Sequence, residues 1–244
     1  MSYDFKRQRH IAYLIIIPAY NEEEHIADVL REARESNISA DILVVNDGST
    51  DGTSALSKQA EVMVLDLPFN IGYGGAIQTG FRFAVEFGYE FVVTLDGDGQ
   101  HSPYSVHTLM ETMEREKADV VIGSRFIEGA YHMGIFRKMG VWLFSRIAFF
   151  YIGTNFSDPT SGFQLLNRRI FSYLAQGDNY PLDYPDVNII IAIHKMRFKV
   201  LEAPVRMNEK HGNSMHQGLR PIIYVIRMFL AIIMVLLRKE EKQL

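Results

Sequence analysis

Two carboxylates one residue apart, Asp96 and Asp98, lie in the segment Leu95-Asp96-Gly97-Asp98-Gly99-Gln100-His101. The segment follows residues 91–94, an apolar and β-branched run that predicts a buried strand. Carboxylate and amide oxygens suit hard cations such as Mg²⁺ or Mn²⁺, which can hold the phosphates of a nucleotide. We therefore predict a metal site with Asp98 as the main ligand and with Asp96 and Gln100 in support. The alternative interpretation is a simple Asp-Gly turn between strands.

The first half of the chain alternates predicted strands and helices. The strands cover residues 13–17, 42–45, 62–65, 91–95 and 120–123, and the helices cover residues 22–35, 53–60, 76–87 and 104–116. Such alternation predicts an α/β domain with a mostly parallel sheet and helices on both faces. Ligands of such sheets bind beyond the carboxyl ends of the strands. Polar clusters follow the predicted strands at residues 18–22, 46–49, 96–100 and 124–125, so we expect one site at that edge.

The second half of the chain is less regular. Residues 139–152 predict a helix that contains the single tryptophan, Trp142, and a turn is expected at residues 158–163. A proline-bounded loop at residues 181–186 opens a predicted helix over 187–195, which a strand at 198–203 and a polar loop at 209–218 follow. We predict one domain over residues 1–218 and an apolar helical appendage over residues 219–244.

The composition of the 244 residues excludes several kinds of site. No cysteine is present, so disulfides, thiolate metal sites and cysteine nucleophiles are excluded. The net charge of −4 argues against a nucleic-acid partner. Residues 195–244 nevertheless contain ten Lys or Arg against four Asp or Glu. This excess indicates an anionic partner near that end, either phosphate or lipid head groups.

The apolar run at residues 221–237 needs a cover. It is bounded by Arg220 and Arg238, and as a helix it would span about 25 Å, less than the roughly 30 Å of a hydrocarbon core. We favour a helix that lies in the membrane interface or inserts partly. A helix buried in an oligomer and a true spanning helix are the alternatives. A second copy of the chain and a small membrane protein are therefore further expected partners.

Five short segments, taken in order, carry a resemblance to a known family. They are Ile-Pro-Ala-Tyr-Asn-Glu at 17–22, Asn-Asp-Gly-Ser-Thr-Asp-Gly-Thr at 46–53, Asp-Gly-Asp-Gly-Gln-His at 96–101, Gly-Ser-Arg at 123–125 and Ser-Gly-Phe at 161–163. Over about residues 12–215 the chain resembles family 2 glycosyltransferases, and among them the dolichol-phosphate mannosyltransferase and bacterial polyprenyl-phosphate branch. The resemblance implies a GT-A fold, a nucleotide-sugar donor, a divalent cation and inversion at the anomeric carbon of the sugar.

The chain departs from the family pattern in one motif. Where Asp-Asp-Gly-Ser is typical, it has Asn46-Asp47-Gly48-Ser49, so an amide replaces one carboxylate. The string Gln-x-x-Arg-Trp, which marks processive polysaccharide synthases, is absent from the sequence. A processive synthase is therefore not expected.

The resemblance also implies residues that bind the donor. The departing diphosphate gathers negative charge, which a cation and cationic side chains must offset. Arg125 is implied to reach the diphosphate, and Arg137 and Lys210 to complete that contact, although each could instead be a solvated surface charge. Asp96 is expected to serve the donor as well as the metal. The residues implied to line the base and ribose are Pro18, Tyr20, Glu22, Asp47, Asn70 and Gly72. For Glu22 the alternative is an acid at a helix N-terminus, and for Asp47 it is a turn residue.

The acceptor side depends on the chemistry of the acceptor. An alcohol needs a general base, whereas a phosphate is already ionised at neutral pH. By resemblance, we assign Asp186 the role of base or of acceptor-positioning residue, with Asp183 as its substitute. The alternative for both is capping of the helix that starts at Val187. His101 is interpreted as adjacent to the site.

We expect an inverting, metal-dependent enzyme that moves a hexose from a UDP- or GDP-linked donor to a polyprenyl phosphate. The apolar helices at 139–152 and 221–237 are expected to hold it on the cytoplasmic face of the membrane, peripherally or partly inserted. One alternative is a transferase that extends a lipid-linked glycan. A sugar-nucleotide pyrophosphorylase would carry Arg and Lys directly after the first strand, where this chain has the acidic segment 18–22. A non-catalytic membrane scaffold would not need both Asp96 and Asp98.

Overall fold

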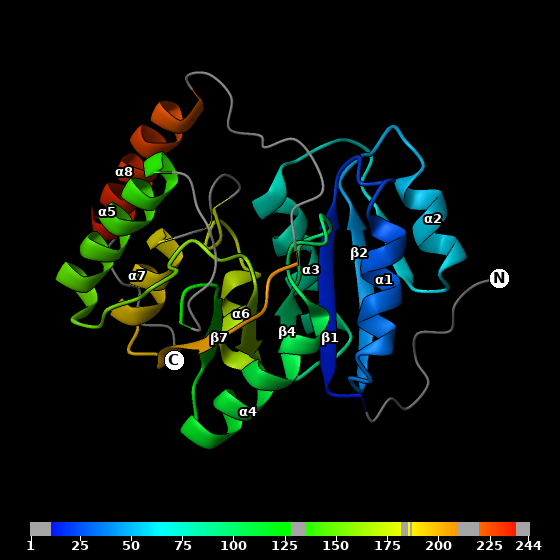
Figure 1. Ribbon diagram of the computed structural model, residues 1–244, viewed down its shortest axis with the longest axis horizontal. Helices are drawn as coiled ribbons and strands as arrows, with labels where there is room; N and C mark the ends of the chain where they lie inside the picture. Colours follow the sequence, from blue (N-terminus) through cyan, green and yellow to red (C-terminus); the bar gives the residue numbers. More distant parts are fainter. Residues whose placement is uncertain (1–10, 128–134, 182–184, 186, 209–219, 238–244) are drawn as a thin grey trace.

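The computed structural model describes residues 11–127, 135–181, 185, 187–208 and 220–237. Within these ranges, residues 135–139, 141 and 220–226 are described by their backbone alone. The chain forms a seven-stranded sheet in the order β3-β2-β1-β4-β6-β5-β7, which helices cover on both faces (Figure 1). This arrangement confirms the mostly parallel α/β sheet predicted from the sequence.

Four parallel strands build the half of the sheet that begins the chain. They are β1 (Tyr13–Ala19), β2 (Ala40–Asn46), β3 (Met63–Asp66) and β4 (Phe91–Thr94). β1 lies between β2 and β4, and its side chains alternate between two cores, with Leu14 and Ile16 in one and Ile15 and Ile17 in the other. Burial on both faces explains why β1 is apolar throughout rather than alternating with polar residues.

One strand of the second half runs against its neighbours. β5 (Val120–Ser124) and β7 (Val200–Pro204) are parallel, but β6 (Gln164–Asn167) lies between β4 and β5 and is antiparallel to both. Neither β6 nor the helix α6 (Arg168–Leu174) that follows it was expected. The side chain of Asn167 caps this helix by accepting the N–H of Ile170 at 3.2 Å.

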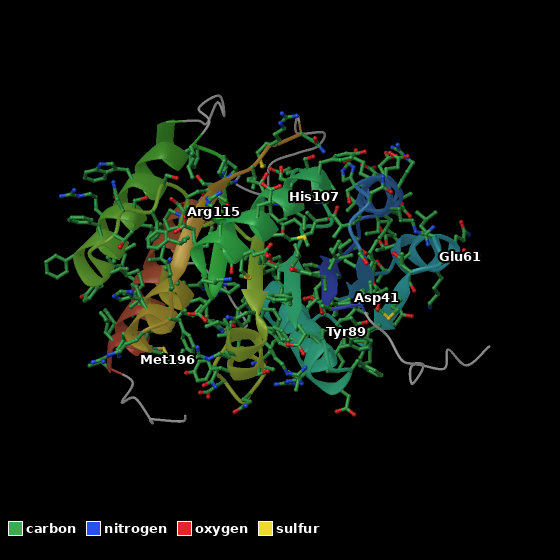
Figure 2. All side chains as sticks on the ribbon, turned by 90° about the horizontal axis from the view of Figure 1, so that it is seen from below. Asp41, Glu61, Tyr89, His107, Arg115 and Met196 are labelled. Carbon is green, nitrogen blue, oxygen red and sulfur yellow. The ribbon has the colours of Figure 1, made fainter. Side chains whose placement is uncertain are left out.

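The helices form two layers. The first layer contains α1 (Ile26–Glu35), α2 (Thr53–Gln59) and α4 (Val106–Glu116), which the 3₁₀ turn η1 (Pro103–Ser105) precedes. The second contains α3 (Tyr73–Glu86), α6 and α7 (Val187–Lys195), with α5 (Ile135–Ile152) and α8 (Arg220–Leu237) against α7. At the edge of the sheet where the parallel strands begin, the hydroxyl of Tyr89 donates to Asp41 at 2.7 Å (Figure 2). This bond joins the start of β4 to the start of β2.

Several helices begin at other residues than the sequence predicted; α3, for example, begins at Tyr73 rather than at residue 76. α1 begins at Ile26 rather than at residue 22, because the carbonyl of Glu22 accepts the N–H groups of His25 and Ile26 in a turn. α5 begins at Ile135, ahead of the expected residue 139.

The C-terminal run forms a helix over almost the range predicted, and Met228 and Ile232 of α8 enter the same core as Phe144 of α5. In the part of the chain that the structure describes, no helix combines the length and the hydropathy that crossing a bilayer requires. The division at residues 218 and 219 stays a prediction, as do the membrane, oligomer and small-protein partners of the run.

Candidate active site

Three loops meet beyond the carboxyl ends of β1, β2 and β4. Backbone hydrogen bonds join them, from the N–H of Asp47 to the carbonyl of Ala19 at 2.8 Å and from the N–H of Leu95 to Ile16 at 3.0 Å. Segments 18–22, 47–49 and 95–101, which are far apart in the sequence, are thereby brought to one edge. This is the edge of the sheet at which ligands of α/β proteins bind.

Asp47 is buried and holds the glycine-rich turn at residues 70–72. One carboxylate oxygen accepts the N–H of Ile71 at 2.8 Å and the other accepts the N–H of Gly72 at 3.0 Å. Gly48 has a φ of +70°, and a Cβ there would lie 2.7 Å from the backbone of Asn70. Both carboxylate oxygens of Asp47 are thus engaged by the protein, and its contact with a base or ribose stays a prediction.

Asn46 shows what the departure from the family pattern does. Its side-chain N–H donates to Asp66 at 2.8 Å, while its carbonyl oxygen accepts the N–H of Ser49 at 3.2 Å. A carboxylate at this position could not donate, and it would face the negative charge of Asp66. The amide therefore suits this loop better than the acid it replaces.

Asp96 is fixed on both sides. The hydroxyl of Tyr73 lies 3.0 Å from one carboxylate oxygen, and Nδ1 of the buried His101 lies 3.2 Å from the other. Burial alone would raise the pKa of Asp96, but the His101 ring, the Tyr73 hydroxyl and the charge of Arg125 together lower it. Asp96 therefore keeps its negative charge and its orientation.

Gly162 makes room for this arrangement. A Cβ at this position would lie 2.5 Å from the Tyr73 hydroxyl and 3.2 Å from a carboxylate oxygen of Asp96. The carbonyl of Gly162 also accepts the hydroxyl of Thr94, in β4, at 2.6 Å. The Ser-Gly-Phe motif thus packs directly against Asp96.

Asp98 and Gln100 lie in the same segment as Asp96, residues 95–101, which we call the acid loop. One oxygen of Asp98 accepts the N–H of Gln100 at 3.0 Å, and the other accepts its side-chain N–H. Burial raises the pKa of Glu22, and the nearby charge of Asp98 raises it further, with smaller contributions from Asp51 and Asp96. Glu22, Asp96 and Asp98, which we call the acid cluster, therefore repel one another.

The side-chain atoms of the acid loop that could ligate a metal suit a hard divalent cation. All are oxygens, and a cation would offset the repulsion within the acid cluster while phosphate oxygens completed its shell. Among the described residues, no group of three or more His, Cys, Asp or Glu side chains is arranged to hold an ion by itself. A metal here would thus depend on Asp98, Gln100 and Asp96 together with its substrate.

Arg125 follows β5 and is buried in a two-pronged ion pair with Asp158. Nε lies 2.6 Å and a terminal nitrogen 2.7 Å from the two carboxylate oxygens of Asp158, which has no exposed surface. The N–H groups of Ser157 and Asp158 in turn donate to Glu202 in β7, each at 2.7 Å. The guanidinium predicted to reach a diphosphate is thus held near Asp96 by the buried Asp158, which is itself held by the half-buried Glu202.

The remaining predicted residues divide into three groups. Pro18 is buried within β1, while Tyr20 and Asn70 are exposed at the rim of the three loops. Arg137 lies in α5, where only the backbone is described. Asp183, Asp186 and Lys210 lie outside the described residues.

Sequence reasoning missed Tyr73, the part that Gly162 plays, and Glu202. Tyr73 lies 23 residues before Asp96 in the sequence and Gly162 lies just before β6, so no local spacing relates either residue to Asp96. The pairing of Asp158 with Arg125 was not expected either. A proline-terminated turn, Ser157-Asp158-Pro159, was the one signal available.

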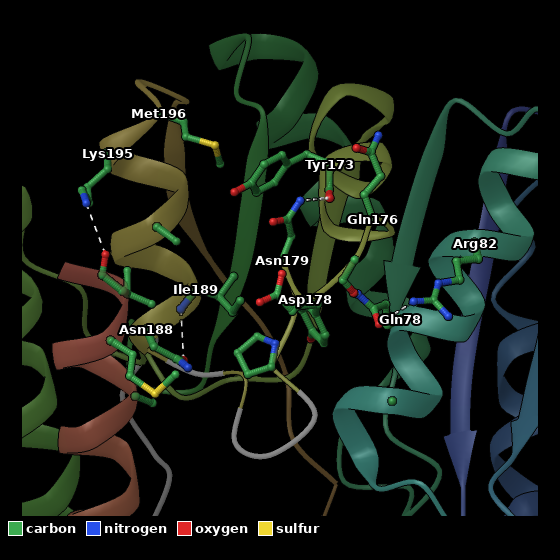
Figure 3. Close-up of a pocket in the computed structure, with 18 of the residues that line it drawn as sticks. Gln78, Arg82, Tyr173, Gln176, Asp178, Asn179, Asn188, Ile189, Lys195 and Met196 are labelled. Atoms are coloured by element: carbon green, nitrogen blue, oxygen red, sulfur yellow. Dashed lines mark hydrogen bonds between the residues drawn. The ribbon is translucent and has the colours of Figure 1, made fainter. Parts of the chain in front are cut away.

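A groove of about 1210 Å³ lies beside α3 (Figure 3). It is lined by α3, residues 176–181, α7 and the last turns of α8. Gln78 and Arg82 of α3 hold its wall by donating to the carbonyls of Leu174 and Ala175. Its described lining includes Ile71 but no member of the acid cluster, so the groove is separate from the acid loop.

The sequence of the chain matches known proteins in the region that carries this site. Residues 14–174 match the family model described as glycosyl transferase family 2. The chain belongs to glycosyl transferase family 2. This membership confirms the family and the transferase class predicted from the five motifs.

Curated relatives of this family 2 chain include proteins named for lipid phosphate acceptors. An undecaprenyl-phosphate mannosyltransferase of Micrococcus luteus is 39% identical over 158 residues, which cover 62% of this chain and 64% of that protein. A polyprenol monophosphomannose synthase of Mycolicibacterium smegmatis is 28% identical over 81% of this chain and 77% of its own length.

Solved structures confirm the GT-A type of fold. Glucosyl-3-phosphoglycerate synthase of Mycobacterium tuberculosis, crystallised with Mn²⁺, UDP and phosphoglyceric acid, has a TM-score of 0.70 at 16% identity, over 95% of this chain and 81% of that one. A mannosyltransferase of Pyrobaculum calidifontis, crystallised with GDP-Man and Mn²⁺, has a TM-score of 0.67 at 17% identity, over 94% and 65%.

Proposed function

We propose that this family 2 chain is an inverting, metal-dependent glycosyltransferase that transfers a hexose from a UDP- or GDP-linked donor to a polyprenyl phosphate at the cytoplasmic face of the membrane. The observation that carries the proposal is the acid cluster beside the buried Arg125–Asp158 pair. Acidic groups that suit a cation lie near the Arg125 guanidinium, which supports a site for a metal-bound diphosphate. The names of the relatives from Micrococcus luteus and Mycolicibacterium smegmatis support the choice of a lipid phosphate as acceptor.

The proposed reaction is a single displacement at the anomeric carbon. The bond from this carbon to the diphosphate oxygen breaks, a bond to an oxygen of the acceptor phosphate forms on the opposite face, and the nucleoside diphosphate leaves. The acceptor oxygen is already ionised, so no proton has to be removed from it. Asp186 and Asp183 are then proposed to position the acceptor, and would act as bases only for an alcohol.

Each donor-side residue has a distinct task in this proposal. Asp98 and Gln100 hold the cation, and Asp96 is kept ionised and oriented beside them by Tyr73 and His101. A bound Mg²⁺ or Mn²⁺ supplies charge stabilisation for the departing diphosphate. The Nε and one terminal nitrogen of Arg125 are engaged by Asp158, so its remaining N–H groups are proposed to reach the diphosphate, and Arg137 and Lys210 are proposed to contribute further positive charge. The residues proposed to surround the base and ribose are Pro18, Tyr20, Glu22, Asp47, Asn70 and Gly72.

A donor panel followed by an acceptor panel tests the proposal. We expect UDP or GDP to raise the melting temperature only when Mn²⁺ or Mg²⁺ is present, because ligands that bind the native state stabilise it. The matching nucleotide sugar should then label a polyprenyl phosphate, and NMR of the product should show the inverted anomer. Labelling of a lipid-linked saccharide alone would replace the acceptor. Formation of a nucleotide sugar from sugar phosphate and nucleoside triphosphate would identify a pyrophosphorylase instead.

A further inference from the structure

Helices α5 and α8 expose large apolar side chains at one end of the molecule. Trp142 and Phe150 of α5 are 65% and 81% exposed, and Met234 of α8 is 71% exposed. Figures 1 and 2 both place the two helices next to each other at that end, and the rings of Phe144 and Phe229 join them at 6.3 Å. Among the described side chains of the two helices, the other exposed large apolar ones are Phe149, Tyr151, Phe229, Leu230, Ile233 and Leu237. We call these outer side chains the α5–α8 face.

The α5–α8 face is not the side on which the helices pack. Phe144 and Ala148 of α5 are buried in the main core, as are Met228 and Ile232 of α8. Each helix is therefore apolar on its inner side, which the protein covers, and again on its outer side, which it does not. An apolar face of this extent on a soluble domain marks a site of contact with a partner.

The charges on these helices identify the chemistry of the partner. Ile135–Ile152 and Arg220–Leu237 contain five Lys or Arg and no Asp or Glu. The rest of the chain contains more acidic than basic residues, since the net charge of the whole chain is −4. Arg146 is exposed, and its guanidinium carbon lies 5.7 Å from the ring of Phe149 on the face. Basic groups set among apolar and aromatic side chains match an anionic lipid surface, which offers phosphates above hydrocarbon.

The residue types on α5 suit the interface of a bilayer. Trp and Tyr side chains concentrate where head groups meet acyl chains, because each has an apolar body and a polar tip. Trp142 and Tyr151 are of this kind, and Phe149 and Phe150 lie beside Tyr151. A protein partner that covered the face would have to bury Arg146 as well, at the cost of its hydration.

We propose that the α5–α8 face is a docking surface for an anionic lipid bilayer, into whose head-group layer Trp142 and Phe150 enter. This inference rests on the proposed function, in that a polyprenyl phosphate is presented by such a bilayer. It goes further by assigning the contact to particular side chains of two helices. α5 also lies between Arg125 and Asp158 in the chain.

The single tryptophan makes the inference directly measurable. Trp142 is the only tryptophan in the chain, so its emission reports on α5 alone. With the full chain and vesicles of phosphatidylcholine and phosphatidylglycerol, we expect a blue shift, and quenching when the acyl chains carry bromine. Binding should weaken when phosphatidylglycerol is left out or when salt is raised. Unchanged emission and no co-flotation with the anionic vesicles would overturn the proposal.

Matched variants locate the surface. Phe150→Glu and Met234→Glu should each reduce vesicle affinity by about tenfold or more, because each places a negative charge on the apolar face. Phe149→Glu should do so as well, whereas Phe87→Glu, at the end of α3, should leave affinity unchanged. The two phenylalanines are 43% and 42% exposed, so they differ in place rather than in exposure. Equal losses from Phe149→Glu and Phe87→Glu would contradict the assignment.

Two further measurements separate this inference from its alternatives. If the wild-type chain sediments as a dimer without vesicles and Phe150→Glu makes it a monomer, a second copy covers the face and the bilayer proposal is wrong. Transfer to a short, water-soluble prenyl phosphate tests the proposed function by itself. Phe150→Glu should retain that transfer while losing vesicle binding. A wild-type chain that binds vesicles but transfers no sugar would contradict the proposed function and would still support the docking surface.

Discussion

The strand-end loops and the α5–α8 face hold their side chains in different ways. At the strand ends, backbone N–H groups donate to both carboxylate oxygens of Asp47, and Asp96 lies between the Tyr73 hydroxyl and the His101 ring. On α5 and α8, exposed side chains such as Phe150 and Met234 are placed by the helix backbone. Binding of a nucleotide sugar, which is compact and multiply charged, requires protein groups that are fixed in advance. Binding to a fluid membrane surface requires only apolar area and positive charge.

The Arg125–Asp158 pair stands between these two regions. Arg125 leaves β5 toward the strand-end loops, and Asp158 follows α5 on the way back to the sheet. Both residues of the pair are buried, as core residues are, and both are charged, as the residues of the strand-end loops are. It therefore provides the sharpest place to ask whether the two regions work separately.

The largest expected effect comes from Asp98→Ala. Loss of the proposed main cation ligand should reduce transfer by about a thousandfold or more, since the diphosphate would leave without the charge that stabilises it. Initial rates with saturating Mn²⁺, and the Mn²⁺-dependent rise in melting temperature with nucleotide, measure the change. Vesicle binding should stay as in the wild type, and Asp28→Ala, at an exposed acid of α1, should alter neither. A variant that kept most of its transfer would contradict the metal assignment.

Asp158→Ala is expected to act mainly on stability. It leaves the buried guanidinium of Arg125 without its partner, which should lower the free energy of unfolding by roughly 3 kcal/mol or more. Urea unfolding monitored by circular dichroism measures this. Asp28 and Arg31 pair at a similar distance but on the surface, so Asp28→Ala should change little. If the two variants lost the same stability, burial of the Arg125–Asp158 pair would not be what matters.

Gly162→Ala should have a smaller, local effect. The added Cβ would press on the Tyr73 hydroxyl and displace it from Asp96, so we expect transfer to fall about tenfold, the effect of roughly one lost charge-assisted hydrogen bond. Adding Tyr73→Phe removes the crowded hydroxyl, and the double variant should lose less than the two single losses combined. Gly140→Ala, where the new Cβ meets open space, serves as the control. Strict additivity of the two changes would contradict the contact.

The smallest expected effect is a change in pH dependence in Glu202→Gln. Burial raises the pKa of Glu202, against the lowering effect of hydrogen bonds from Ser157 and Asp158. The folded chain therefore keeps this proton to a higher pH than the unfolded chain, and wild-type stability falls as pH rises from the unfolded pKa through the folded one. The variant cannot ionise, so its stability relative to the wild type should improve over that window. Urea unfolding at several pH values would show a constant difference if Glu202 were not coupled in this way.

The sequence predicted the strand-end region well because its signals are local. Each buried strand is an apolar run, each is followed by polar residues and a turn, and parallel strands bring those followers together. The positions of Asp96, Asp98 and Gln100 could thus be predicted from their place after one strand. The boundaries that shifted, at residues 22–26, did so because Glu22 entered a turn before the helix began.

The parts that were missed depend on contacts between distant segments. β6 has four residues and no alternation of polar and apolar side chains, so its pairing with β4 and β5 decides its structure. Asn167 was a usable cap signal for α6, because it precedes an apolar run at helical spacing. Nothing in the spacing of Arg125, Asp158 and Glu202 indicates that they meet. Only the order of the strands brings them together.

The reversed direction of β6 has a consequence for how the chain can vary. Because this strand runs against its neighbours, the residues that precede it arrive at the edge where the other strands end. One short stretch can therefore touch two loops at once, Gly162 reaching Asp96 and Asp158 reaching Arg125. Insertions within α5 would leave both contacts in register, whereas a single residue gained or lost between 158 and 162 would shift one against the other.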